Sequence, residues 1–121
     1  MWELTKSFRF EAAHSLAGTS LGNAGEEIHG HSFRAEVVIR GVPDPATGML
    51  VDLIKLEKEL DGIRSILDHK LLDKIEPLGH PTLENLSRFV WERVRNVGNV
   101  VRVSVHRDSC GESCTFYGKE G

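Results

Sequence analysis

The sequence has few of the features that mark nucleic-acid-binding, membrane or secreted proteins. It has 15 Lys and Arg against 18 Asp and Glu, a net charge of −3, and no run of basic residues. A nucleic-acid partner is therefore not expected. No apolar stretch is long enough to cross a bilayer, and Met1–Lys6 lacks the charged and apolar regions of a secretory signal. We expect a cytoplasmic protein with no membrane partner.

Cysteine is also scarce, since Cys110 and Cys114 are the only two. In a cytoplasmic chain such a pair is expected to be free thiols rather than a disulfide. Two close cysteines supply only half of a zinc site, so a cysteine-based metal site is poorly supported.

The composition is that of an ordinary globular protein. Hydrophobic residues make up 40% and charged residues 27% of a chain of 121 residues, without internal repeats. This length suits one domain with a modest core, so we predict a single domain over residues 1–121.

Two segments alternate between apolar and polar residues with the period of a β-strand. In residues 3–14, His14 shares the apolar face, and in residues 29–41 both His29 and His31 do so. If the strands pair antiparallel, the end of the first lies beside the start of the second. The three imidazoles then converge, and three neutral nitrogens with an open fourth position are typical of catalytic zinc. We therefore predict that Zn²⁺ binds there.

The remaining chain predicts two helices and two further strands. Apolar residues recur at helical spacing after Asp52 and again after Thr82, and each of these two residues suits an N-cap. Alternation predicts strands near residues 101–106 and 114–117, with a turn between them. Residues 15–28 form a long connection with three glycines, which we interpret as an active-site loop.

This order predicts an α+β fold. The elements run β-β-α-α-β-β, which implies one antiparallel sheet with both helices on one face. The other face and the sheet edges are then available for assembly with further copies of the chain.

Five motifs in sequence order resemble the 6-pyruvoyl-tetrahydropterin synthase and 6-carboxy-tetrahydropterin synthase family. They are Phe10–His14, His29–His31, Thr47–Asp52, Leu67–His69 and Pro81–Asn85. The resemblance implies the tunnelling fold, in which subunit sheets join into a barrel in a trimer and two trimers stack as a homohexamer.

The resemblance also implies roles for individual residues. His14, His29 and His31 match the zinc ligands of the family. Asp68 and His69 match an Asp-His pair that a neighbouring subunit supplies for proton transfer. A surface histidine after a helix is the alternative interpretation of His69.

Further matches concern the pterin ring. Thr82 and Glu84 match a segment that contacts it, although Glu84 also suits the first turn of a helix. The family has a glutamate after the third strand that anchors the ring. Strand alternation puts Arg107 there, alignment backwards from Cys114 puts Asp108 there, and Glu112 is a third candidate. Among these we favour Asp108.

One departure affects the expected chemistry. The family usually has a catalytic cysteine four residues before the first histidine of His-x-His, and that position is Gly25 here. Glu26 follows, and the run Glu26–His29 resembles a subgroup in which glutamate replaces cysteine. We predict Glu26 as a catalytic base; the alternative is that Glu26 and Glu27 only make the loop soluble.

These points predict a zinc-dependent lyase that cleaves the side chain of dihydroneopterin, or of its triphosphate, in pterin or folate-type biosynthesis. One alternative is a 6-carboxy-tetrahydropterin synthase of deazapurine (queuosine) biosynthesis. Alternatives of other classes are a non-catalytic pterin- and zinc-binding paralogue and a generic zinc hydrolase.

Overall fold

Two long antiparallel strands form the centre of the sheet in the computed structural model, which describes residues 1–15 and 27–118. β1 (Trp2–His14) and β2 (His29–Gly41) pair over their whole length. Trp2 lies opposite Gly41 at one end, and His14 lies opposite His29 at the other. The sequence prediction that the three histidines meet at one end of this hairpin is therefore confirmed.

Three shorter strands complete the sheet in the order β3-β1-β2-β4-β5. β4 (Val100–Arg107) pairs antiparallel with β2, and β5 (Glu112–Tyr117) pairs antiparallel with β4. β3 (Lys70–Leu71) pairs parallel with β1. The sequence did not predict β3, because two residues carry no detectable alternation.

The two helices begin at the residues that the sequence predicted. α2 (Leu53–Leu67) is capped by Asp52, whose carboxylate accepts hydrogen bonds from the amides of Ile54 and Lys55. α3 (Leu83–Val94) is capped by Thr82. Two 3₁₀ turns, Leu72–Lys74 and Glu76–Leu78, connect β3 to α3.

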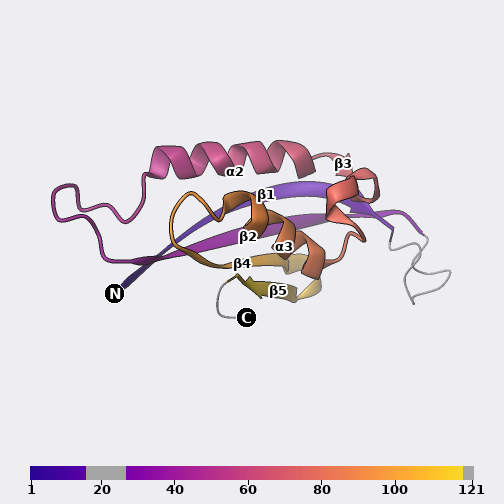
Figure 1. Cartoon of the computed structure of the whole chain (residues 1–121). Helices are drawn as coiled ribbons and strands as arrows, with labels where there is room; N and C mark the ends of the chain where they lie inside the picture. The colour runs from indigo at the N-terminus through magenta and orange to yellow at the C-terminus, as the bar shows by residue number, and fades with distance from the viewer. Residues whose placement is uncertain (16–26, 119–121) are drawn as a thin grey trace.

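The core lies between the helices and one face of the sheet, which we call the covered face (Figure 1). Phe10 and Phe33 stack on this face with ring centroids 4.9 Å apart. Fully buried side chains from both helices pack over the sheet, among them Leu56, Leu60, Leu86 and Val90. The predicted α+β class, with both helices on one face, is confirmed.

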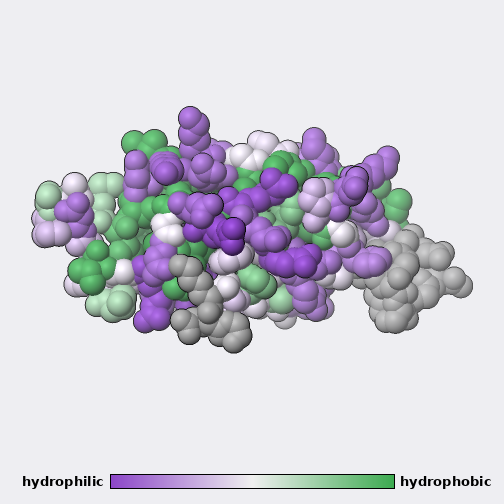
Figure 2. All heavy atoms as spheres, in the orientation of Figure 1, coloured by the Kyte–Doolittle hydropathy of each residue, from purple (hydrophilic) through white to green (hydrophobic). Residues whose placement is uncertain are grey.

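The opposite face of the sheet, which we call the open face, carries the alternate residues of the strands, many of them charged. The side of the molecule drawn in Figure 2 is largely hydrophilic, and hydrophobic side chains emerge near the start of α2. Cys110 and Cys114 are free thiols, as predicted. None of the helices in the described residues is long and apolar enough to span a membrane.

Candidate active site

Three imidazoles meet where β1 ends and β2 begins. His14 is 1% exposed, His31 is partly buried and His29 is exposed. One ligand nitrogen from each lies within 4.8 Å of the others. The Nε2 atoms of His14 and His29 are 3.1 Å apart.

Hydrogen bonds determine which ring nitrogen of each imidazole is free. The Nδ1–H of His14 donates to the Pro81 carbonyl at 2.9 Å, and that of His29 donates to the Glu27 carbonyl at 3.0 Å. Because a carbonyl only accepts, the proton must be on Nδ1 and the lone pair on Nε2. The His31 Nδ1 faces the Cys110 sulfur at 3.9 Å, and its buried Nε2 has no bonding partner among the described residues.

These nitrogens fit a metal ion. Two lone pairs facing each other at 3.1 Å repel unless a cation lies between them. Two nitrogens on one tetrahedral zinc, each at about 2.0–2.1 Å, lie about 3.3 Å apart. Burial lowers the pKa of His14 and also that of His31, and the Arg107 guanidinium lowers both further. Both shifts favour the neutral form of these two rings, which is the form that binds metal.

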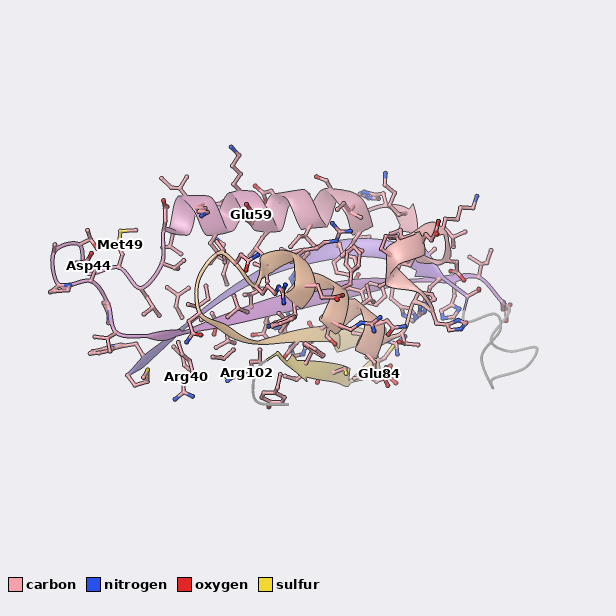
Figure 3. All side chains as sticks on the ribbon, viewed as in Figure 1. Arg40, Asp44, Met49, Glu59, Glu84 and Arg102 are labelled. Carbon is pink, nitrogen blue, oxygen red and sulfur yellow. The ribbon has the colours of Figure 1, made fainter. Side chains whose placement is uncertain are left out.

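A cavity of about 620 Å³ adjoins the buried His14 ring. Its lining comes from the start of α3 and from the β4–β5 turn, and includes Thr82, Glu84, Arg107 and Glu112. Figure 3 shows Glu84 on the first turn of α3, at the end of the molecule where β5 begins. Polar groups of both signs thus surround the space next to the three histidines.

The structure separates the three candidates for the ring anchor. Arg107 and Glu112 line the cavity, and Asp108 is not among the described residues that do so. Asp108 lies on the open face instead, where Arg34 donates to both of its oxygens at 2.9 and 3.1 Å. The hydrogen bonds from Arg34 hold the pKa of Asp108 below its usual value. Glu112 therefore lines the cavity and the predicted Asp108 does not, and the identity of the ring anchor stays a prediction.

Asp68 and His69 are in contact, although neighbouring side chains on a regular element diverge. His69 has a φ of 58°, which turns its ring so that Nδ1 lies 3.1 Å from Asp68. The Asp68 carboxylate accepts from the Glu11 amide at 2.8 Å, and this bond, more than the nearby Arg64, lowers the pKa of Asp68. The His69 side chain is 79% exposed, so its Nε2 is available for proton exchange.

This pair lies away from the cavity that contains Glu84 and Glu112. His69 lines a shallow hollow of about 640 Å³ together with Glu11, Ser32 and His31. One chain thus brings together the three histidines, Thr82 and Glu84, while His69 borders a separate hollow that His31 also lines.

Comparison with known proteins identifies the family. The family model described as 6-pyruvoyl tetrahydropterin synthase matches residues 3–119. The chain belongs to this family. A dihydroneopterin monophosphate aldolase of Pyrococcus furiosus is 40% identical over 86 residues, covering 71% of this chain and 68% of that protein. A 6-carboxy-5,6,7,8-tetrahydropterin synthase of Synechocystis is 32% identical over 120 residues, covering 95% and 89%.

A solved structure of the 6-pyruvoyl tetrahydropterin synthase family agrees with the observed fold. The Caenorhabditis elegans 6-pyruvoyl tetrahydropterin synthase superposes with a TM-score of 0.84 at 27% identity, over 98% of this chain and 96% of that one. The tunnelling fold predicted from the sequence motifs is confirmed for the subunit. As a family member, the chain is a lyase of pterin metabolism.

Two sequence predictions for this 6-pyruvoyl tetrahydropterin synthase family member lie outside the described residues. These are Glu26, the predicted base, and Gly25, which takes the place of the family cysteine. Both stay predictions.

Two contacts of the site were missed by sequence reasoning. The Pro81 carbonyl and the Cys110 thiol each hold one of the histidines, 67 and 79 residues away in the chain. No sequence pattern indicates contacts of this kind. The face of the sheet on which Arg107 lies could have been predicted, because strand alternation puts it on the same face as Val103 and Val105.

Proposed function

We propose that this protein is a zinc-dependent aldolase that cleaves the side chain of a dihydroneopterin compound. The observation that carries the proposal is the convergence of one ring nitrogen from each of three histidines beside a polar cavity, with the Nε2 atoms of His14 and His29 free of protons. The name of the Pyrococcus furiosus relative supports cleavage of a carbon–carbon bond and suggests the monophosphate as one substrate. We infer a cytoplasmic location, as the sequence predicts.

His14, His29 and His31 would hold the zinc ion. When bound, zinc supplies a Lewis acid that lowers the pKa of the substrate hydroxyls and stabilises negative charge on oxygen. The chain itself supplies the orientation of the ligands, because backbone carbonyls hold the Nδ1–H groups of His14 and His29, and the Cys110 sulfur lies 3.9 Å from the Nδ1 of His31.

Glu112 is our proposed anchor for the pterin ring. A pterin presents a ring N–H and an exocyclic amino group side by side, and a carboxylate accepts both hydrogen bonds. Glu112 lines the cavity and its side chain is 51% exposed, so its oxygens reach the enclosed space. Thr82 and Glu84 border the same space, while the Thr82 hydroxyl oxygen also caps α3.

The proposed reaction needs one group to remove a proton and one to return it. A base takes the proton from the hydroxyl on the second side-chain carbon. As the C=O bond forms there, the bond to the first side-chain carbon breaks, and its electron pair moves into the C=N bond of the ring. An acid then protonates the first carbon to give the 6-hydroxymethyl product.

We assign these proton transfers to Glu26 and to the Asp68–His69 pair. Glu26 comes one residue after Gly25, which occupies the position of the family cysteine. Its carboxylate is suited to the first step. His69, oriented by Asp68, presents an exposed imidazole that can accept or donate a proton. In our proposal the pair serves the metal centre of a neighbouring subunit in a homohexamer made of two trimers.

A second candidate function is 6-carboxy-tetrahydropterin synthesis. The Synechocystis relative of that name matches 95% of this chain, more than the aldolase does. A third is a non-catalytic pterin- and zinc-binding protein, which the absence of the family cysteine favours.

A product assay separates these candidates. The zinc-loaded protein is incubated with dihydroneopterin, its monophosphate and its triphosphate, and the products are identified by mass spectrometry. We expect 6-hydroxymethyl-dihydropterin, together with glycolaldehyde or its phosphate. A 6-carboxy product from the triphosphate would instead establish the second function. Zinc and pterin binding with no turnover of any substrate would establish the third.

A further inference from the structure

Arg107 and Glu112 form an ion pair across the β4–β5 hairpin, next to the candidate metal centre. They are paired in register, and the Arg107 Nη2 donates to the Glu112 Oε1 at 2.8 Å. Gly111, with a φ of 67°, makes the left-handed turn that returns the chain, a conformation that favours glycine. Both side chains lie on the covered face and line the cavity next to His14.

The two members of this pair have unequal access to the cavity. The Arg107 side chain is 16% exposed, whereas that of Glu112 is 51% exposed. Both line the cavity together with Thr82 and the buried His14. The guanidinium therefore lies deeper in the wall, and the carboxylate lies nearer the opening.

The guanidinium has more donors than the protein uses. Arginine has five N–H donors, and Glu112 accepts from Nη2. The Nε of Arg107 is buried, and no acceptor in residues 1–15 or 27–118 lies within bonding distance of it. A buried donor without an acceptor is costly. On the open face, by contrast, the Nε of Arg34 has a carboxylate partner at 2.9 Å.

The pair presents an acceptor and a donor side by side to the same space. This combination is complementary to a cyclic amide, in which an N–H group stands beside a C=O group. A phosphate fits it less well, because Glu112 neutralises the guanidinium and Glu84 adds a second negative charge to the cavity wall.

We propose that Arg107 determines specificity for the oxo group of the heterocycle. Glu112 accepts from the ring N–H, and the free N–H groups of Arg107 donate to the adjacent carbonyl oxygen. This inference rests on the proposed function, since it assumes that a pterin occupies the cavity. It adds a requirement that a carboxylate alone does not impose, because a carboxylate accepts from an amino group at the oxo position as readily as from the ring N–H.

A pair of ligands tests this requirement. The dissociation constants of 2-amino-4-oxopteridine and 2,4-diaminopteridine are measured by fluorescence at near-neutral pH, where both rings are neutral. We expect the wild-type protein to bind the 4-oxo ligand at least tenfold more tightly. Arg107→Met removes the donors, and we expect the ratio of the two constants to fall below about threefold.

Arg102→Met is the matched control. Arg102 is also on β4 and is also paired with a glutamate, Glu3, at 3.1 Å, but it lies at the other end of the hairpin, opposite Tyr117 (Figure 3). We expect this variant to keep the wild-type ratio. If Arg107→Met does not give a cooperative melting curve, Arg107→Lys takes its place, and the ratio should fall at least threefold because one ammonium lacks the planar fork.

The outcomes separate this inference from the proposed function. If the wild-type protein binds neither pteridine, the proposed function is wrong. If it binds the 4-oxo ligand and Arg107→Met keeps the wild-type ratio, only the role of Arg107 is wrong. Equal or tighter binding of the 4-amino ligand by the wild-type protein would also overturn the proposed role of Arg107.

Discussion

On the open face of the sheet, charged side chains pair with one another, whereas the polar side chains at the His14 end of the covered face border a cavity. The charged atoms of the open-face pairs lie within hydrogen-bonding distance of each other. The Arg34 Nε is 2.9 Å from an Asp108 oxygen, and the Arg102 Nη2 is 3.1 Å from a Glu3 oxygen. On the covered face, the Nε2 of His31 and the Nε of Arg107 are buried and have no bonding partner in the described part of the chain.

This difference distinguishes polar groups that are paired within the protein from buried polar groups that have no partner among the described residues. Exposed ion pairs contribute little to stability and are satisfied within the protein. Buried donors and acceptors without partners are rare in folded proteins, because each loses its hydrogen bonds to water. The comparison therefore predicts that changes on the covered face alter metal and ligand binding, and that matching changes on the open face do not.

The largest effect is expected from His31→Ala. Loss of one of three ligands should reduce bound zinc from about one ion per chain to nearly none. The rate of side-chain cleavage should fall at least about 1,000-fold, since a Lewis acid supplies several kcal/mol to such reactions. Zinc is measured by mass spectrometry after gel filtration, and the rate by product formation.

His106→Ala is the control for this prediction, because His106 lies on the open face and pairs with Glu36. It should keep both the metal and most of the activity. A His31→Ala protein with wild-type zinc content would show that the three histidines do not form the metal site.

The next largest effect is expected on binding of the pterin ring. It is tested by changing one carboxylate on each face of the sheet. Glu112→Gln should raise the KM for the pterin substrate about 10- to 100-fold, because hydrogen bonds to a charged group are worth about 1.5–3 kcal/mol. Asp108→Asn should leave the KM within about threefold, since Asp108 is occupied by Arg34 on the open face. Steady-state kinetics of the two variants decide between them; the reverse order of effects would restore Asp108 as the anchor.

These two carboxylates also show how far the sequence alone could lead. The histidine triad was predictable because alternation holds in the parts of β1 and β2 that carry the histidines, Phe8–His14 and His29–Val37, so each side chain there has a definite face. Between Asp108 and Glu112 the chain makes a 3₁₀ turn and a left-handed residue, Gly111. Alternation fails across such a turn, and the face of each residue then follows only from the structure.

The contact between Asp68 and His69 could not be predicted from the sequence for a related reason. It depends on a positive φ at His69, a conformation that is uncommon for residues other than glycine. The family resemblance named the pair, but its geometry follows from β3, whose two residues attach the segment to β1.

A smaller effect is expected for a mixture of two inactive variants, and it tests whether Asp68 and His69 act on a neighbour. His31→Ala lacks the metal centre and His69→Ala lacks the exposed imidazole that Asp68 holds. If the site is shared between subunits, hybrids formed by mixing, dissociation and reassembly should recover about a quarter of wild-type activity, because a quarter of the sites combine two intact halves. The absence of any recovery, with hybrid assembly confirmed by native mass spectrometry, would contradict a shared site, as would a monomeric mass by light scattering.

The smallest effect belongs to the open face and appears only in acid. The hydrogen bonds from Arg34 lower the pKa of Asp108 in the folded protein relative to the ordinary value of 3.8. A lowered folded pKa means that this interaction stabilises the protein fully above the unfolded value and is lost as pH falls through the folded value. The free energy of unfolding of the wild-type protein should therefore exceed that of Asp108→Asn at pH 7, and the difference should shrink below about pH 4.

Urea unfolding of both proteins across this pH range measures that difference, and added salt should reduce it at pH 7, because exposed charges are screened. A difference that stays constant with pH would mean that the Asp108 carboxylate has the same pKa in the folded and unfolded chains. The pairing with Arg34 would then not distinguish the open face from ordinary solvent-exposed charge. Because Asp108 takes no part in the cavity, this outcome would leave the assignment of Glu112 and the histidine triad unchanged, so the two faces can be tested independently.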